Sequence, residues 1–200
     1  MRNVVSRLSH FRRLTSGTML LRMTRTMTDD SFVASRALAS DRPNTALRTL
    51  LTRLIQTSDS FAPTVARVGL GTIMFAHGAQ KVFGWFGGSG FSTTLASFTV
   101  KQGIPLPFAL AAILGESLGA LALVTGVLSR VAAAWIAVIM VVAVAMVHLK
   151  FGFFMNWGGK HPGEGFEYHL LALALAGVVM IAGGGAASVD RWLMQRSARR

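Results

Sequence analysis

Five polar residues that could carry proton chemistry lie in a chain that is otherwise strongly apolar. They are His77, Lys81, His148, Glu167 and His169. Imidazole and carboxylate groups exchange protons near neutral pH, and an ammonium group holds negative charge. These residue types therefore predict a site for proton transfer or for charge recognition, provided that the fold brings them together.

The spacing of these residues does not favour a metal site. The sequence contains no HxxxH and no ExxH pair, and it has no cysteine, so thiolate zinc, iron–sulfur clusters and disulfides are excluded. Ligands for a metal would have to come from three separate helices. We therefore predict no metal.

Four apolar segments must position the five residues: residues 62–83, 106–127, 130–149 and 166–187. Each has about 20 residues, which as a helix spans the hydrocarbon core of about 30 Å. Hydrophobic residues make up 52% of the chain and charged residues 14%, with a mean hydropathy of +0.51. We predict an all-α protein with a four-helix membrane bundle over residues 61–192. A buried soluble bundle is the alternative, but it would leave little polar surface for water.

The distribution of basic residues predicts the orientation. Seven Lys or Arg lie near the spans on the side of the termini and four on the side of the long loops, so both termini are predicted to be cytoplasmic. The five polar residues then share a similar depth near the outer surface. Trp85 and Trp157 lie in the same outer loops, where they would form aromatic walls for a ligand. The net charge of +12 forms no compact basic stripe, so we expect no nucleic-acid partner.

Two further charged residues lie inside the predicted spans. Glu116 lies about 15 Å from either end of its segment, where a carboxylate costs about 3 kcal/mol unless it is paired or protonated. We predict an intramembrane charge pair between Glu116 and Arg67. The alternative is that Glu116 only forms hydrogen bonds between helices.

The ends of the chain are predicted to lie outside the bundle. Residues 1–42 form a disordered basic tail, residues 43–60 an amphipathic helix on the membrane surface, and residues 193–200 a basic cytoplasmic tail. Residues 1–28 contain six Arg and no acidic residue, a composition typical of a targeting segment. The alternative is that translation begins at Met27. The sequence does not decide whether residues 1–26 belong to the mature protein.

Four stretches of sequence carry a family pattern: RVGLGTIMFAHGAQKVFGWFGGSGF, GIPLPFALAAILGESLGALALVTGVLSRVAAAW, HLKFGFFMNWGG and EYHLLALALAGVVMIAGGGAASVDRW. Over about residues 65–192 the chain resembles the DoxX family of small bacterial integral membrane proteins. The resemblance implies a multi-pass protein of the bacterial inner membrane. It also implies kinship with membrane subunits of quinone-linked oxidoreductases. Six residues fall on polar positions of the family pattern: Arg67, His77, Lys81, Glu116, His148 and Glu167.

Three functions stay open from the sequence. The first is the membrane subunit of a quinone-linked oxidoreductase system, with quinone as the candidate cofactor and a redox protein as partner. The second is a small proton-coupled transporter or channel, and the third is a membrane scaffold for a peripheral enzyme. Catalysis by this chain itself is undecided. In each case we expect the chain to contact the lipid bilayer and to act as a homo-oligomer or as a subunit of a complex.

Overall fold

The computed structural model describes residues 42–199, and within them every regular element is a helix. The chain divides into two compact units, residues 1–50 and 51–200. Of the first unit the structure describes residues 42–50, which belong to α2 (Arg42–Ile55). The predicted basic tail over residues 1–42 lies outside the described residues, apart from Arg42. The location of the predicted amphipathic helix on a membrane surface stays a prediction.

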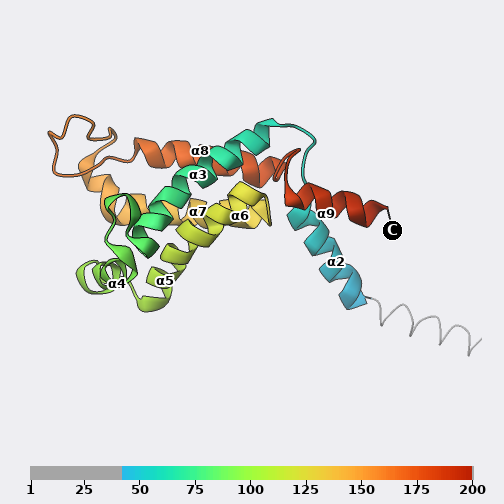
Figure 1. The fold of residues 1–200 in the computed structure, drawn as a ribbon, viewed down its shortest axis with the longest axis horizontal. Helices are drawn as coiled ribbons and strands as arrows, with labels where there is room; N and C mark the ends of the chain where they lie inside the picture. Colours follow the sequence, from blue (N-terminus) through green and yellow to red (C-terminus); the bar gives the residue numbers. More distant parts are fainter. Residues whose placement is uncertain (1–41, 200) are drawn as a thin grey trace, which may run out of the picture. The chain divides into compact units, whose positions relative to one another are not determined.

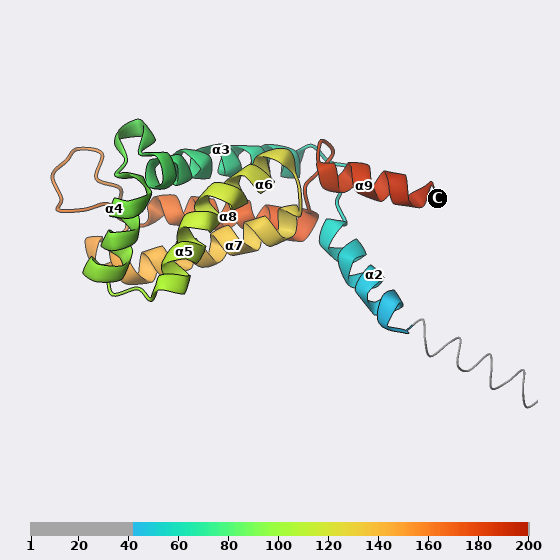
Figure 2. The same cartoon turned by 60° about the horizontal axis from the view of Figure 1, so that its bottom comes forward.

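The core of the second unit is formed by helices that pack lengthwise (Figures 1 and 2). Helix α7 packs along α8, and α3 packs on both α6 and α8. Their bounds are α3 (Ala62–Phe83), α5 (Leu106–Leu114), α6 (Ala120–Thr125), α7 (Ser129–Ala143) and α8 (Glu167–Ala182). Aliphatic side chains and alanines fill the space between them, with Leu70, Met74, Leu123, Ile136 and Val179 almost fully buried.

Two of the helical paths contain π-helical turns that the sequence did not predict. The turn η3 (Gly115–Gly119) joins α5 to α6, and the turn η4 (Val144–His148) extends α7 into the short 3₁₀ turn η5 (Leu149–Phe151). A π turn adds a residue to the helical repeat and changes which side chains face a neighbour, and such turns often occur at functional sites. Glu116 lies in η3 and His148 ends η4, so both π turns carry a candidate residue.

Among the described residues, two continuous helices are long and apolar enough to cross a membrane, Leu106–Thr125 and Ser129–Phe151. The first predicted span matches α3, which has 22 residues but is not in this set. The fourth predicted span, 166–187, is too long: α8 has 16 residues and ends at Ala182. Gly183 ends it with a φ of 80°, in the left-handed region that glycine adopts without strain. The crossing of a bilayer by four helices stays a prediction.

Shorter elements occupy the connections. Between α3 and α5 the chain forms η1 (Trp85–Gly87), α4 (Gly90–Ala96) and the π turn η2 (Ser97–Lys101), and α4 packs on α3. After α8 a glycine-containing loop leads to α9 (Val189–Ala198), which begins in the last of the four family stretches and contains Asp190. Residues 152–166 connect η5 to α8 without a regular helix or strand.

Candidate functional site

Two histidines from adjacent helices lie against each other. His148 comes at the end of the π turn that extends α7, and His169 is in the first turn of α8. Their ring centroids are 4.2 Å apart with an angle of 45° between the ring planes. The His148 Nδ1 atom lies 2.8 Å from the backbone carbonyl oxygen of Glu164, in the loop that precedes α8. The packing of α7 on α8 therefore brings together two of the residues that the sequence singled out.

His169 is buried and has one nitrogen without a partner. The residue is 6% exposed, and no hydrogen bond to Nδ1 is formed within the described part of the chain. A buried polar atom without a partner costs about 1–3 kcal/mol, so such an atom in a native fold calls for an explanation. A bound ligand that hydrogen-bonds to the imidazole would supply the missing partner.

Tyr168 connects this pair to His77 on α3. The Tyr168 ring centroid lies 5.5 Å from that of His169 and 5.8 Å from that of His77. The Tyr168 hydroxyl approaches the Met74 sulfur at 3.5 Å. We call His77, His148, Tyr168 and His169 the histidine cluster. Sequence analysis passed over Tyr168, although it is the only tyrosine in the chain and adjoins a candidate histidine.

An ion pair lies beside the histidine cluster. The Lys81 ammonium group pairs with the Glu116 carboxylate, and their side chains are 21% and 8% exposed. His77, one helical turn before Lys81, interacts electrostatically with both charges. Glu116 also interacts electrostatically with Tyr168. The ion pair therefore lies close enough to the cluster to interact electrostatically with His77 and Tyr168.

The predicted pair between Arg67 and Glu116 is wrong. Gly78 on α3 lies directly against Glu116, since a Cβ atom on Gly78 would come within 2.6 Å of the Glu116 carbonyl oxygen. This close contact sets the register of α3 against η3 and places Lys81, one turn further on, beside the carboxylate. Arg67 is about 16 Å of helix before Gly78 and lies beyond the reach of Glu116.

Arg67 instead donates hydrogen bonds to backbone carbonyls at the other end of the core. Its Nη1 atom donates to Leu123 at 2.5 Å and Val124 at 2.7 Å, and Nε donates to Gly184 at 2.7 Å. Its Nη2 atom donates to the carbonyl of Ala187. The residue is 1% exposed. These carbonyls lie near the C-terminal end of α6 and in the loop after α8, where helical hydrogen bonds run out and a cation is favourable.

Asp190 and Arg130 also form hydrogen bonds with backbone groups at the ends of neighbouring helices. The Asp190 carboxylate accepts from the backbone N–H groups of Leu128 and Ser129, both at 2.8 Å, which caps the N-terminus of α7. Arg130 donates to the carbonyls of Met180 and Ile181 at the end of α8. We call Arg67, Arg130 and Asp190 the arginine clasp. Two sequence signals pointed to Asp190: it lies in the fourth of the family stretches, and it is one of four acidic residues after residue 60.

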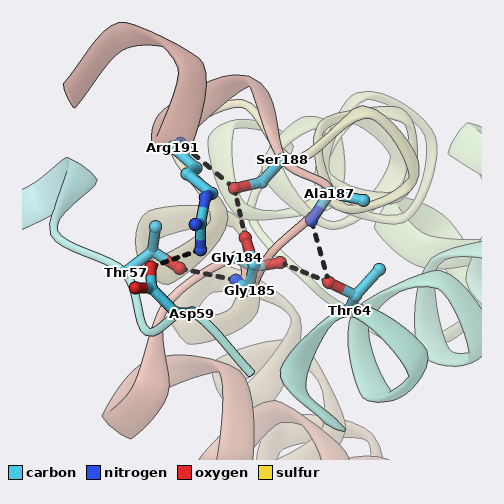
Figure 3. A network of polar contacts seen from close by, with 8 residues as sticks. All are labelled: Thr57, Asp59, Thr64, Gly184, Gly185, Ala187, Ser188 and Arg191. Atoms are coloured by element: carbon cyan, nitrogen blue, oxygen red, sulfur yellow. Dashed lines mark hydrogen bonds and ion pairs between the residues drawn. The ribbon is translucent and has the colours of Figure 1, made fainter. Parts of the chain in front are cut away.

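A further network fixes the loop between α8 and α9 (Figure 3). The Thr57 hydroxyl accepts from the N–H of Gly185 at 2.5 Å, and Thr64 on α3 donates its hydroxyl to the carbonyl of Gly184. Ser188 caps α9, and Arg191 pairs with Asp59. The loop after α8, whose Gly184 and Ala187 carbonyls accept from Arg67, is therefore also hydrogen-bonded to Thr57 before α3 and to Thr64 on α3.

The remaining candidates are not drawn into the histidine cluster. Glu167 is half-buried in the first turn of α8, and its carboxylate forms no ion pair within the described residues. Trp157 is 87% exposed, and the Trp85 ring packs against Phe83 and Phe86. Neither tryptophan ring contacts the histidines within the described residues, whereas Tyr168 does, so the aromatic walls stay a prediction.

Within residues 42–199 no group of three or more His, Cys, Asp or Glu side chains is arranged to hold a metal ion. Two imidazoles in ring contact and one lysine–glutamate pair instead provide hydrogen-bond donors and acceptors in an apolar setting.

Comparison with known proteins gives a family match for one part of the chain. The family model described as DoxX matches residues 62–149. The matched residues run from α3 to η5 and include His77, Lys81, Glu116 and His148. Comparisons with curated proteins and with solved structures gave no match.

Proposed function

We propose that the chain is a membrane protein of the DoxX family and that it binds a quinone at the histidine cluster as the membrane subunit of a redox system, and the match of residues 62–149 to the DoxX model supports the family. The observation that carries the proposal is the unpartnered Nδ1 atom of the buried His169. A quinone offers carbonyl oxygens to imidazole donors and a flat apolar ring to the surrounding aliphatic side chains.

The residues of the cluster fit the chemistry of such a ligand. When bound, a quinone takes up two electrons and two protons. His148 and His169 lie in ring contact, and their imidazole nitrogens can donate to and accept from the oxygens of such a ligand. The Lys81–Glu116 pair lies beside His77 and keeps a positive and a negative charge close to the cluster. The sequence has no cysteine, so no thiol pair of this chain can deliver electrons, and we assign the donor to a separate redox protein.

The test is to identify what the protein carries. The full chain is purified in mild detergent, and its organic extract is examined by mass spectrometry for quinones. We expect a quinone in the wild type and at least a tenfold loss in His169→Leu, since each lost or unpaired polar contact costs about 1–3 kcal/mol. The control is His161→Gln in the outer loop, where only the backbone of His161 holds Asn156. Equal amounts of quinone in His169→Leu and wild type would exclude the cluster as the site.

The Lys81–Glu116 pair favours a second candidate function. Charged residues inside membrane helices often mark pathways for ions, protons or charged substrates. In a proton-coupled transporter Glu116 would carry the proton and Lys81 would hold the carboxylate between cycles. Flux into proteoliposomes that is lost in Glu116→Gln, with no quinone in the purified protein, would replace the redox proposal by this one.

The proposal includes a topology. We place the protein in a bacterial inner membrane, with several spans, both termini in the cytoplasm and the histidine cluster near the outer surface. The support is the excess of Lys and Arg on the side of the termini. A phosphatase that works only in the periplasm, fused after Arg200, should be inactive, and a cytoplasmic fluorescent reporter there should be bright. The opposite result would place the cluster near the inner surface.

A further inference from the structure

His148 makes a hydrogen bond that fixes its tautomer. Its Nδ1 atom lies 2.8 Å from the backbone carbonyl oxygen of Glu164. A carbonyl oxygen only accepts, so Nδ1 must carry the hydrogen in this bond. That hydrogen is present in the neutral Nδ1–H tautomer and in the imidazolium form, so the bond survives a change in the protonation of His148.

The other ring nitrogen is therefore the one that can change. With Nδ1 occupied, a proton can be gained or lost only at Nε2 of His148. Its ring faces His169 from α8, and His77 from α3 interacts electrostatically with His169. The carboxylate of Glu164 is turned to another partner, the backbone N–H of Asn156, at 2.6 Å. The Glu164 carbonyl, and not its carboxylate, therefore orients the imidazole.

The loop that supplies this carbonyl is held together by its own hydrogen bonds. Asn156 donates its side-chain amide to the carbonyl of His161 at 2.7 Å and accepts from the His161 N–H at 3.0 Å. The two ends of the loop meet through Phe166 N–H to Gly152 at 3.2 Å and Glu167 N–H to Phe153 at 2.9 Å. A loop with its ends joined and its interior bonded can present one carbonyl at a fixed position.

We propose that the Glu164 carbonyl holds His148 in the Nδ1–H form, so that Nε2 is the atom that exchanges a proton with the ligand of the histidine cluster. His148 then has two roles: it anchors loop 152–166 through Nδ1 and transfers a proton through Nε2. Proton transfer at Nε2 leaves the hydrogen bond of Nδ1 intact. The proton-transfer half rests on the proposed function, while the tautomer and the anchoring of the loop do not.

Two substitutions of His148 separate the anchoring role from the proton-transfer role. In His148→Asn the amide nitrogen falls near the place of Nδ1, so the bond to Glu164 can be kept while nothing stands at Nε2. In His148→Gln the amide falls near the place of Nε2, so a ligand contact can be kept while the donor to Glu164 is lost. Both variants are made in the full chain in detergent, and each is measured for loop protection and for binding of decylubiquinone.

Hydrogen–deuterium exchange reports the anchor. We expect His148→Asn to leave the exchange of loop 152–166 as in the wild type, and His148→Gln to speed it up about tenfold, the factor that corresponds to one lost hydrogen bond. Decylubiquinone binding should show the reverse pattern, lost in His148→Asn and partly kept in His148→Gln. A loop that is equally protected in both variants would overturn the anchor, and normal binding in His148→Asn would overturn the role of Nε2.

Nitrogen-15 NMR of histidine-labelled protein tests the tautomer without any ligand. In the neutral imidazole we expect the His148 Nδ1 signal to be that of a protonated nitrogen and the Nε2 signal that of an unprotonated one. A neutral Nε2–H tautomer would contradict the inference. If these measurements agree with it but the wild type binds no decylubiquinone, the proposed function fails and the assignment of the tautomer and the anchor stands.

Discussion

The arginine clasp and the histidine cluster differ in whether their buried polar atoms have hydrogen-bond partners. Arg67 is almost fully buried, and its three nitrogens all donate to backbone carbonyls. His169 is buried to a similar degree, yet its Nδ1 atom has no partner within the described residues. Both groups lie on the same bundle of helices, so the difference is not one of burial.

The difference indicates separate roles for the two regions. A polar group whose hydrogen bonds are all made within the chain has nothing left to offer a ligand, and its value is to hold the fold together. A buried group with an unused hydrogen-bonding atom costs stability, and a binding site can recover that cost when the ligand arrives. We therefore interpret the clasp as structural and the cluster as functional, and five substitutions, used in four experiments, can break or sharpen that distinction.

Arg67→Met should have the largest effect on stability. The substitution leaves four carbonyl acceptors without their donor, and each uncompensated buried group costs about 1–3 kcal/mol. We expect the free energy of unfolding in detergent to fall by about 3 kcal/mol or more. Thermal unfolding of the purified protein measures it. A fall below about 1 kcal/mol would show that water replaces the guanidinium easily and that the clasp is not structural.

The Lys81–Glu116 pair should show strong coupling. Lys81→Met and Glu116→Gln each leave one partner uncompensated in an apolar setting, whereas the double variant does not. We expect the double variant to be more stable than the sum of the single effects by about 1–3 kcal/mol.

The matched control for this cycle combines Glu116→Gln with Arg67→Met. Those two residues have separate partners, so their effects should add to within about 0.5 kcal/mol. Coupling in the control cycle, with none between Lys81 and Glu116, would restore the pairing that the structure rejects.

Asp190→Asn should have a moderate effect. The carboxylate accepts from two N–H groups at the start of α7, and the amide can accept from only one with its oxygen while its NH₂ group opposes the other donor. We expect a loss of about 1–2 kcal/mol, similar to the removal of a helix cap. Faster hydrogen exchange confined to the first turn of α7 would locate the effect, and exchange that rises evenly over the whole core would argue against a local cap.

His169→Leu should have the smallest effect, with the opposite sign. The substitution replaces the imidazole by an apolar side chain of similar size and so removes a buried nitrogen that has no partner. Without ligand we expect the stability in detergent to be unchanged or raised by about 1 kcal/mol. A loss comparable to that of Arg67→Met would show that the imidazole is structurally required, and the contrast between clasp and cluster would disappear.

The sequence predicted the helical class and the resemblance of residues 62–149 to the DoxX family, and it predicted several helix boundaries within a few residues. The first predicted span coincides with α3, because hydrophobic length and the glycine at its end are local signals. The end of the fourth span was wrong because alanine and glycine continue the apolar composition past Ala182, while the backbone turns at Gly183.

The partners of the charged residues could not be predicted in this way. The predicted pair of Glu116 with Arg67 assumed ideal depths along straight helices. The contact of Gly78 with η3 instead sets the register of α3 against η3, so that Glu116 pairs with Lys81. The proximity of His148 to His169 depends on a π turn, which has no sequence signature in the patterns that we used. The expected common position near the helix ends fits His77, His148 and His169 but not Glu167, and it carried no information about which atoms form hydrogen bonds.

The central claim is that the unpartnered imidazole of His169 binds a quinone, and ligand-dependent stabilisation tests it most directly. The full chain in detergent is unfolded thermally with increasing decylubiquinone, for the wild type, His169→Leu and the control His161→Gln. At a ligand concentration about 100 times the dissociation constant, binding adds about 2.7 kcal/mol to the stability. The account predicts this stabilisation in the wild type and the control, and its loss in His169→Leu. Equal stabilisation in all three proteins, or none in the wild type, would contradict it.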